Sequence, residues 1–246
     1  MANYLDIETT CIEALISKKR RFMELMDDRK KILGEEALSM FRRQEQLVPL
    51  KYLVRESDTR LGLRAQPTLL SVSIHDGVTA LGSGSSFESR ADNFSNYKIC
   101  QSGDIVINRM RAFQGALGLA NQGGIVSPDY TVLQVGSGVS ANYLHFVMRS
   151  SWFIAEMTRR LRGIGSTDQG QVRTPRINFA DLGLIRIPVP PRERQNEFAL
   201  NLTHQEERLT HVVDLLTQQL DALGERRQAL ITAVVTGEMS VPEVQA

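Results

Sequence analysis

Four polar side chains follow a short apolar run in the middle of the chain. The run is Ile105-Val106-Ile107, and Asn108, Arg109, Arg111 and Gln114 come after it. Arginine and glutamine are the side chains that form paired hydrogen bonds with the edges of guanine and adenine. These side chains, placed after a predicted strand, would suit a surface that contacts nucleic acid.

A second polar segment lies farther along the chain and contains several glycines. Its polar and glycine residues are Arg159, Arg160, Arg162, Gly163, Gly165, Ser166, Thr167, Gln169, Gly170, Gln171 and Arg173. Between residues 149 and 176, six arginines stand against the two acids Glu156 and Asp168, which gives the segment a net charge of +4. Such a loop could follow a DNA groove while its arginines meet phosphates. The alternative is a solvated surface loop whose arginines pack across helices, and these residues leave both open.

Residues that could form a catalytic or metal site are scattered. The carboxylates of the middle region do not cluster as magnesium-dependent nuclease chemistry requires. Methyl transfer would need a cofactor-binding glycine loop and an aromatic clamp such as Asn-Pro-Pro-Tyr, and the sequence contains neither. Cys11 and Cys100 have no Cys/His cluster around them. We therefore expect no catalytic residue, no metal site and no cofactor bound by this chain.

A domain of short strands must position the polar segments. From about residue 47 to residue 188 the chain consists of β-rich runs separated by Gly, Ser, Asn and Asp. Strands are predicted over 69–74, 105–107, 130–135 and 183–187, and a helix over about 142–160. The middle of the chain is therefore predicted to be a globular α+β domain.

A long amphipathic helix is predicted on each side of this domain. From about Ile7 to Arg43, apolar residues recur every three or four positions, with Gly34 as the only glycine. After Pro188-Val189-Pro190-Pro191, a second helix runs to about Gly237 with the spacing of a coiled coil. The two helices can pack antiparallel or exchange with those of a second chain, or they can form a bundle that only stabilises the domain. The positions predicted to contact a helix or partner are Phe22, Met26, Leu33, Leu209, Leu216, Leu220, Leu223 and Leu230.

The composition is that of a folded protein but argues weakly against DNA binding. No apolar run of about 18 residues and no signal-peptide pattern occurs, so we expect a cytoplasmic protein. The formal net charge is +1, whereas DNA-binding proteins usually carry an excess of Lys and Arg. A coiled-coil scaffolding protein without DNA binding is therefore a competing hypothesis.

Four motifs resemble the specificity subunits of type I restriction-modification systems. Residues 103–115, GDIVINRMRAFQG, and 124–130, GIVSPDY, resemble the target-recognition domains of that family. Residues 185–195, IRIPVPPRERQ, look like the entry into the family's conserved helical spacer. Residues 223–237, LGERRQALITAVVTG, resemble the end of that spacer.

The resemblance implies an N-terminal spacer helix at 1–46, a target-recognition domain at 47–190 and a C-terminal spacer helix at 191–246. Family members usually carry two recognition domains and two spacers, whereas this chain carries one domain. A natural half-subunit, a fragment and a product of gene rearrangement all fit this departure. A half-subunit would imply a homodimer that selects a bipartite, inverted-repeat target.

The resemblance further implies a non-catalytic subunit that binds double-stranded DNA and docks a methyltransferase subunit on its helices. A restriction and translocation subunit would join through the complex, and S-adenosylmethionine, ATP and Mg²⁺ would be bound by these partners. A recognition module of another restriction-methylation type shares the DNA-reading role. From side-chain chemistry and loop context, the predicted DNA-facing positions are Asn108, Arg109, Arg111, Gln114, Arg160, Arg162, Ser166, Thr167, Gln169 and Arg173.

Overall fold

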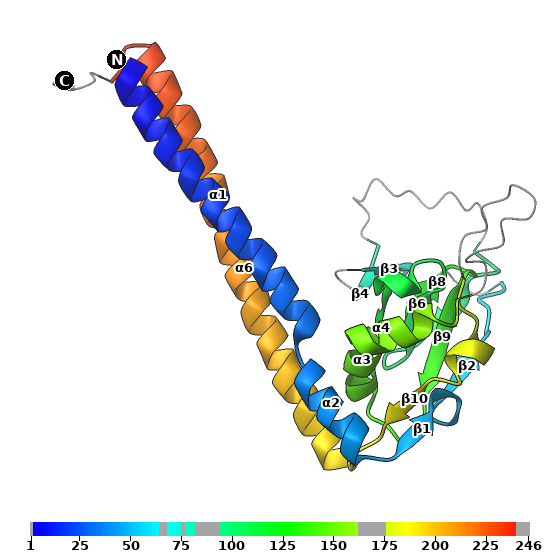
Figure 1. The fold of residues 1–246 in the computed structure, drawn as a ribbon. Coiled ribbons are helices and arrows are strands. Elements are labelled where there is room, and N and C mark those ends of the chain that lie inside the picture. Colours follow the sequence, from blue (N-terminus) through cyan, green and yellow to red (C-terminus); the bar gives the residue numbers. More distant parts are fainter. Residues whose placement is uncertain (1, 64–67, 75–76, 82–93, 162–175, 240–246) are drawn as a thin grey trace, which may run out of the picture. The chain divides into compact units, whose positions relative to one another are not determined.

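The chain forms two compact units (Figure 1). A computed structural model describes residues 2–63, 68–74, 77–81, 94–161 and 176–239. The helical unit comprises Met1–Leu33 with Thr203–Ala246, and the α+β unit comprises Gly34–Leu202. The predicted fold class, an α+β domain flanked by two long helices, is confirmed. The domain bounds at 46/47 and 190/191 stay a prediction.

The helical unit pairs α1, Ala2–Ile32, with the greater part of α6, Arg192–Val235. Three polar side-chain pairs link the helices: Lys30 with Thr210, Lys19 with Gln219, and Glu13 with Arg227. Residue numbers fall along α1 as they rise along α6, so the pairing is antiparallel, and the beginning of α1 lies beside the end of α6 (Figure 1). Ile12, Leu216 and Val234 are buried along the contact between the two helices.

The first predicted helix is interrupted, which corrects the expectation of one helix from Ile7 to Arg43. The structure has α1 and then α2, Glu35–Gln44, with Gly34 between them at a φ of 77°. A Cβ on Gly34 would lie 2.7 Å from Leu202 Cδ1 and 3.0 Å from Phe198 Cζ. The left-handed backbone and this close approach both require glycine. α2 consequently belongs to the α+β unit.

A four-stranded antiparallel sheet forms the centre of the α+β unit, in the order β2-β9-β6-β7. The strands are β2, Val54–Ser57; β9, Tyr130–Val135; β6, Ile105–Asn108; and β7, Leu117–Leu119. In this register, Val132 lies opposite both Ser57 and Val106. The strands predicted at 105–107 and 130–135 are therefore confirmed, and they are neighbours in the sheet.

Two small strand pairs cover one face of the sheet. β3, Leu70–Ser73, pairs with β4, Gly77–Ala80, and β5, Lys98–Cys100, pairs with β8, Gly124–Val126. The side chains buried between these layers are Leu70, Val72, Cys100, Val106, Ala120, Val126 and Val132. Ile105 and Ile107 alternate with Val106, so they face the other side of the sheet, where both are fully buried.

Two short helices pack against the sheet in place of the single helix predicted over about 142–160. α3, Ala141–Arg149, packs on β7, and α4, Ser151–Thr158, packs on the 3-10 turn η2, Ala112–Gln114. Ser150 separates the helices in an extended conformation, and its hydroxyl oxygen accepts a hydrogen bond from the N–H of Phe153. This N-cap ends one helix and starts the next.

The strand predicted over 183–187 begins only at Arg186. A short helix, α5, Phe179–Leu182, precedes it, and Asn178 caps that helix through a bond from the N–H of Asp181. The N–H groups of residues 183–185 bond back to α5 and cannot join a strand. The strand that follows is β10, Arg186–Pro188, which pairs with β1, Leu47–Pro49; the 3-10 turn η1, Leu50–Tyr52, comes after β1.

The predicted helix start after the proline-rich breaker is confirmed, since α6 begins at Arg192. Phe41 of α2, Tyr143 of α3 and Phe198 of α6 form a cluster of edge-on and tilted rings. The hydroxyl of Tyr143 donates to the carbonyl of Pro188 at 3.0 Å. These contacts tie the first turns of α6 to the α+β unit.

Candidate nucleic-acid interface

Several chain segments meet at one end of the four-stranded sheet. β2 and β6 end there and β9 begins there, because Val132 is opposite both Ser57 and Val106. Lys98 is opposite Val126, and the segment after Val126 leads into β9. We call the polar residues of this end, together with Met110, the sheet-end rim. Its members are Ser57, Asp58, Thr59, Arg60, Asn96, Lys98, Asn108, Arg109, Met110, Arg111, Ser127, Asp129 and Arg176.

Asn108 shapes the turn that follows β6. Its side chain is 9% exposed, and its Oδ1 accepts a hydrogen bond from the N–H of Met110 at 3.2 Å. Its backbone carbonyl accepts from the N–H of Arg111 at 3.0 Å. The amide of Asn108 is thus engaged in holding the turn, and Arg111 is exposed beside it.

Arg109 fastens this turn to a distant segment. Its Nε–H donates to the carbonyl of Ile177 at 3.2 Å, and the N–H of Ile177 donates to the carbonyl of Arg109 at 3.4 Å. The guanidinium of Arg176 lies 4.0 Å from Asp129 Oδ1 and 3.9 Å from Met110 Sδ. The structure therefore adds Arg176 to the rim.

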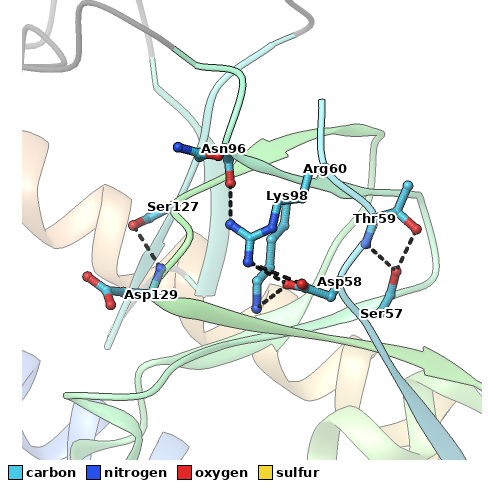
Figure 2. Close-up of polar contacts among 8 residues, drawn as sticks. All are labelled: Ser57, Asp58, Thr59, Arg60, Asn96, Lys98, Ser127 and Asp129. Carbon is cyan, nitrogen blue, oxygen red and sulfur yellow. Dashed lines mark hydrogen bonds and ion pairs between the residues drawn. The ribbon is translucent and has the colours of Figure 1, made fainter. Parts of the chain in front are cut away.

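A carboxylate shared by two cations lies after β2 (Figure 2). Arg60 Nη2 is 3.0 and 3.1 Å from the two carboxylate oxygens of Asp58, and Arg60 Nη1 donates to the carbonyl of Asn96 at 3.0 Å. Lys98 Nζ lies 3.3 Å from Asp58 Oδ1. The hydrogen bond from Arg60, aided by Lys98, holds the pKa of Asp58 below its ordinary value. The carboxylate is consequently ionised at neutral pH.

The sequence-based prediction missed this cluster of Asp58, Arg60 and Lys98. One signal was present: the Asp-x-Arg spacing of Asp58 and Arg60 places both side chains on the same side of an extended chain. No local pattern pointed to Lys98, which comes to Arg60 only through a bridge between the two backbones.

Arg160 follows α4 and is bound to its own helix. Its Nη1 donates to the carbonyl and to a carboxylate oxygen of Glu156, both at 2.7 Å, and Arg159 pairs with the same carboxylate. The hydrogen bond from Arg160 lowers the pKa of Glu156. Arg160 is 32% and Arg159 73% exposed at the side chain, so the pair of arginines retains cationic surface.

The structure brings only part of the predicted set together. Asn108, Arg109 and Arg111 are in the rim, whereas Gln114 is exposed at the end of η2, on which α4 packs. Five predicted positions lie outside the described residues: Arg162, Ser166, Thr167, Gln169 and Arg173. Contact with DNA stays a prediction for every member of the set.

The chain's thiols and possible metal ligands give no sign of a reactive centre in the described residues. Burial raises the pKa of Cys100 to about 12, so this thiol stays protonated, while Cys11 is exposed on α1. Among the residues that the structure describes, no group of three or more His, Cys, Asp and Glu side chains could hold a metal ion. The described helices include none that is long and apolar enough to cross a membrane.

The predicted helix-contact residues divide by exposure. Leu216 is buried at 9% exposure. Partly buried are Met26, Leu33, Leu209, Leu220, Leu223 and Leu230. Phe22 is 44% exposed. Other large apolar side chains on α1 are between 43% and 66% exposed, namely Ile7, Leu15, Leu25 and Ile32.

These elements define a class of fold, in which an antiparallel sheet domain is entered by one long helix and left by another that pairs with the first. A chain from a structure reported for the complex assembly and conformational transition of the type I restriction-modification system has this fold. It is 14% identical, with a TM-score of 0.55, and the match covers 94% of this chain and 58% of that one. This chain therefore has the fold of the specificity subunits of type I restriction-modification systems.

Two further solved structures are similar at lower scores. The HsdS subunit from Thermoanaerobacter tengcongensis is 14% identical with a TM-score of 0.49, over 94% of this chain and 57% of that one. The type I S subunit from M. genitalium is 14% identical with a TM-score of 0.44, over 93% of this chain and 57% of that one. This chain thus spans a little over half the length of these subunits. No protein-family model and no curated protein matches the sequence.

Proposed function

We propose that this chain is a sequence-specific DNA-recognition subunit of a type I restriction-modification system. The observation that carries the proposal is the fold, which a chain of such a system shares over 94% of this one. The sheet-end rim supports it, since five of its side chains are cationic and only Asp58 and Asp129 are anionic. A local excess of cations suits a phosphate backbone even though the whole chain is almost neutral.

In this proposal the chain itself catalyses nothing. Its helices dock a methyltransferase subunit, and a restriction and translocation subunit joins through the resulting complex. S-adenosylmethionine, ATP and Mg²⁺ are bound by those partners. The chain's own contribution is to bind double-stranded DNA and to choose where methylation occurs.

A homodimer completes the proposal. The exposed apolar side chains of α1, from Ile7 through Phe22 to Ile32, are not covered by α6. A second copy of the chain would bury them and would place two identical recognition domains about a two-fold axis. Such a dimer selects a bipartite, inverted-repeat target with a fixed gap.

The experiment that tests the function combines assembly with methylation mapping. Light scattering after size-exclusion chromatography measures the mass of the chain alone and mixed with a candidate methyltransferase subunit from a neighbouring gene. Sequencing that detects methylated bases then maps modification of plasmid DNA by the complex. We expect a dimer, a stable larger complex and methylation of one bipartite sequence.

Two other outcomes would replace the proposal. A dimer that binds neither DNA nor the methyltransferase would favour the scaffolding hypothesis. The nearly neutral net charge of +1 supports that hypothesis. Binding of a defined DNA sequence without assembly with that subunit would instead favour a recognition module of another restriction-methylation type.

A further inference from the structure

The segment after β2 holds an arginine in a fixed orientation at the sheet-end rim. Arg60 contacts both oxygens of Asp58 and the carbonyl of Asn96 (Figure 2). A guanidinium has five N–H donors, and these contacts use three of them at most. Donors therefore remain on Arg60 for a ligand.

The backbone beneath Arg60 is pinned as well. Residues 60 and 98 form a bridge between antiparallel segments. On either side of it, the N–H of Leu61 donates to the carbonyl of Tyr97 at 2.9 Å, and the N–H of Ile99 donates to that of Thr59 at 2.8 Å. A side chain presented from such a backbone loses less conformational entropy on binding.

Lys98 gives the cluster a charge that an ordinary surface ion pair lacks. Its side chain is only 6% exposed, whereas those of Arg60 and Asp58 are 41% and 62% exposed. An exposed Asp–Arg pair contributes little to stability. Stability of this pair therefore does not explain why Lys98 is buried beside it. With both cations on one carboxylate, the cluster carries a net charge of +1 and Arg60 is its outward cation.

The chemistry of Arg60 matches one base edge. Guanine presents two acceptors, O6 and N7, in the major groove, and arginine is the side chain that bonds both at once. A carboxylate that orients the guanidinium favours this paired geometry over a loose contact with phosphate. We propose that Arg60 reads a guanine in the DNA target and that Asp58 is its positioning residue. This inference rests on the proposed function.

The test is a selection of binding sites from a random pool of double-stranded DNA. The full chain, assembled with its methyltransferase subunit, is compared with Arg60→Ala, Arg60→Lys and Asp58→Ala. The control is Arg55→Ala, because Arg55 is an exposed arginine within β2, opposite Gln134, and is not a member of the rim. Thermal unfolding of each variant verifies that it is folded, and Arg60→Lys keeps the charge while losing the paired donors.

We expect the Arg60 and Asp58 variants to recover the wild-type site at all positions but one. At that position, preference for guanine should fall by about tenfold to a hundredfold in both Arg60 variants, the range set by one paired base contact. Asp58→Ala should reduce the same preference partially, and Arg55→Ala should leave it unchanged. A merely structural role of Asp58 would change stability without changing the preferred base.

Two results overturn the inference. An unchanged site in both Arg60 variants would remove Arg60 from recognition, and an even loss of affinity at every position would make it a phosphate contact. Failure of the proposed function looks different, since the wild-type complex itself would then recover no sequence from the pool.

Discussion

The side-chain Oε1 of Gln195 accepts a hydrogen bond from the backbone N–H of Ser140 at 2.7 Å. The same carboxamide donates from Nε2 to the carbonyl of Pro190 at 2.8 Å. Gln195 is 1% exposed, so neither backbone group can turn to water. The residue thus joins the start of α3 to the proline-rich junction and to α6, and it accounts for a glutamine four positions after Pro191.

Replacing Gln195 with alanine is expected to destabilise the α+β unit. The change leaves the N–H of Ser140 and the carbonyl of Pro190 buried without partners, at a cost of about 1–3 kcal/mol for each group. Urea unfolding followed by the fluorescence of Trp152, the single tryptophan, measures the loss. Asn196→Ala, at an exposed neighbour on α6, is the matched control. Equal stability of the two variants would show that these hydrogen bonds are dispensable.

Two glycine-to-alanine substitutions should change the free energy of unfolding in opposite directions. At Gly34 the backbone has a φ of 77° and a Cβ would approach Leu202 Cδ1 to 2.7 Å, so we expect Gly34→Ala to cost at least about 1 kcal/mol. Gly224 lies inside α6 with no atom within 4 Å of an added Cβ, so Gly224→Ala should stabilise the helix by up to about 1 kcal/mol. Thermal unfolding compares the variants, and destabilisation by Gly224→Ala would contradict this account of the helices.

The stability of the α+β unit should fall in acid because of His145. Burial, with the nearby charge of Arg149, lowers the pKa of His145 to about 3, and its Nδ1 accepts from the N–H of Leu119. In the unfolded chain His145 binds a proton below about pH 6.5, whereas in the folded chain it stays neutral until the pH approaches its lowered pKa. Between these pH values the free energy of unfolding should decrease by up to about 1.4 kcal/mol per pH unit from this group.

The measurement that isolates His145 is the difference in unfolding free energy between the wild-type chain and His145→Gln. The glutamine can still accept the bond from Leu119, but it does not titrate. We expect the wild-type advantage at pH 7.5 to shrink steadily as the pH falls toward 4.5. A difference independent of pH would mean that His145 is protonated in the folded state as easily as in the unfolded one.

Substitutions on the two sides of the helix pair should separate association from folding. Phe22 and Leu25 are 44% and 45% exposed, so Phe22→Ser with Leu25→Ser should weaken dimerisation or methyltransferase binding and leave the unfolding free energy almost unchanged. Leu216 is 9% exposed, and Leu216→Ala should cost about 2–5 kcal/mol. Light scattering and urea unfolding measure the two effects. A double variant that still dimerises and binds the methyltransferase would exclude this face of α1 as the interface.

The arginines after α4 should contribute to DNA affinity without affecting assembly. Arg160→Ala together with Arg162→Ala is expected to weaken DNA binding and to leave dimerisation intact. Arg160→Ala alone should have a smaller effect, because its guanidinium is held by Glu156. Fluorescence anisotropy over a range of salt concentrations measures the change in DNA affinity. The slope of the logarithm of the binding constant against the logarithm of the salt concentration should become shallower by about one for each phosphate that the variant no longer neutralises. Arg186→Ala, at an exposed arginine of β10, serves as control. Unchanged affinity in the double variant would remove this segment from the interface.

Local patterns in the sequence determined the elements that depend on neighbouring residues. The short β-rich runs around Ile105 and Val132, bounded by turn residues, marked two strands of the central sheet, and Pro188 to Pro191 marked where α6 begins. The three- and four-residue spacing of apolar side chains marked both long helices. These patterns can be read from the sequence because each reflects which residues of a single helix or strand are buried in the folded chain.

Only the tertiary structure decided which residues far apart in the sequence come into contact. Only glycine fits at position 34, between α1 and α2, because Phe198 and Leu202, far along the chain, occupy the space that a Cβ would take. Lys98 meets Asp58 only because β-sheet register and a backbone bridge bring two segments together. Register is set by the packing of the whole sheet and not by the residues next to each position. The sequence therefore determined the presence of two long helices, several strands and the candidate turn, and the fold decided which charged side chains share the rim.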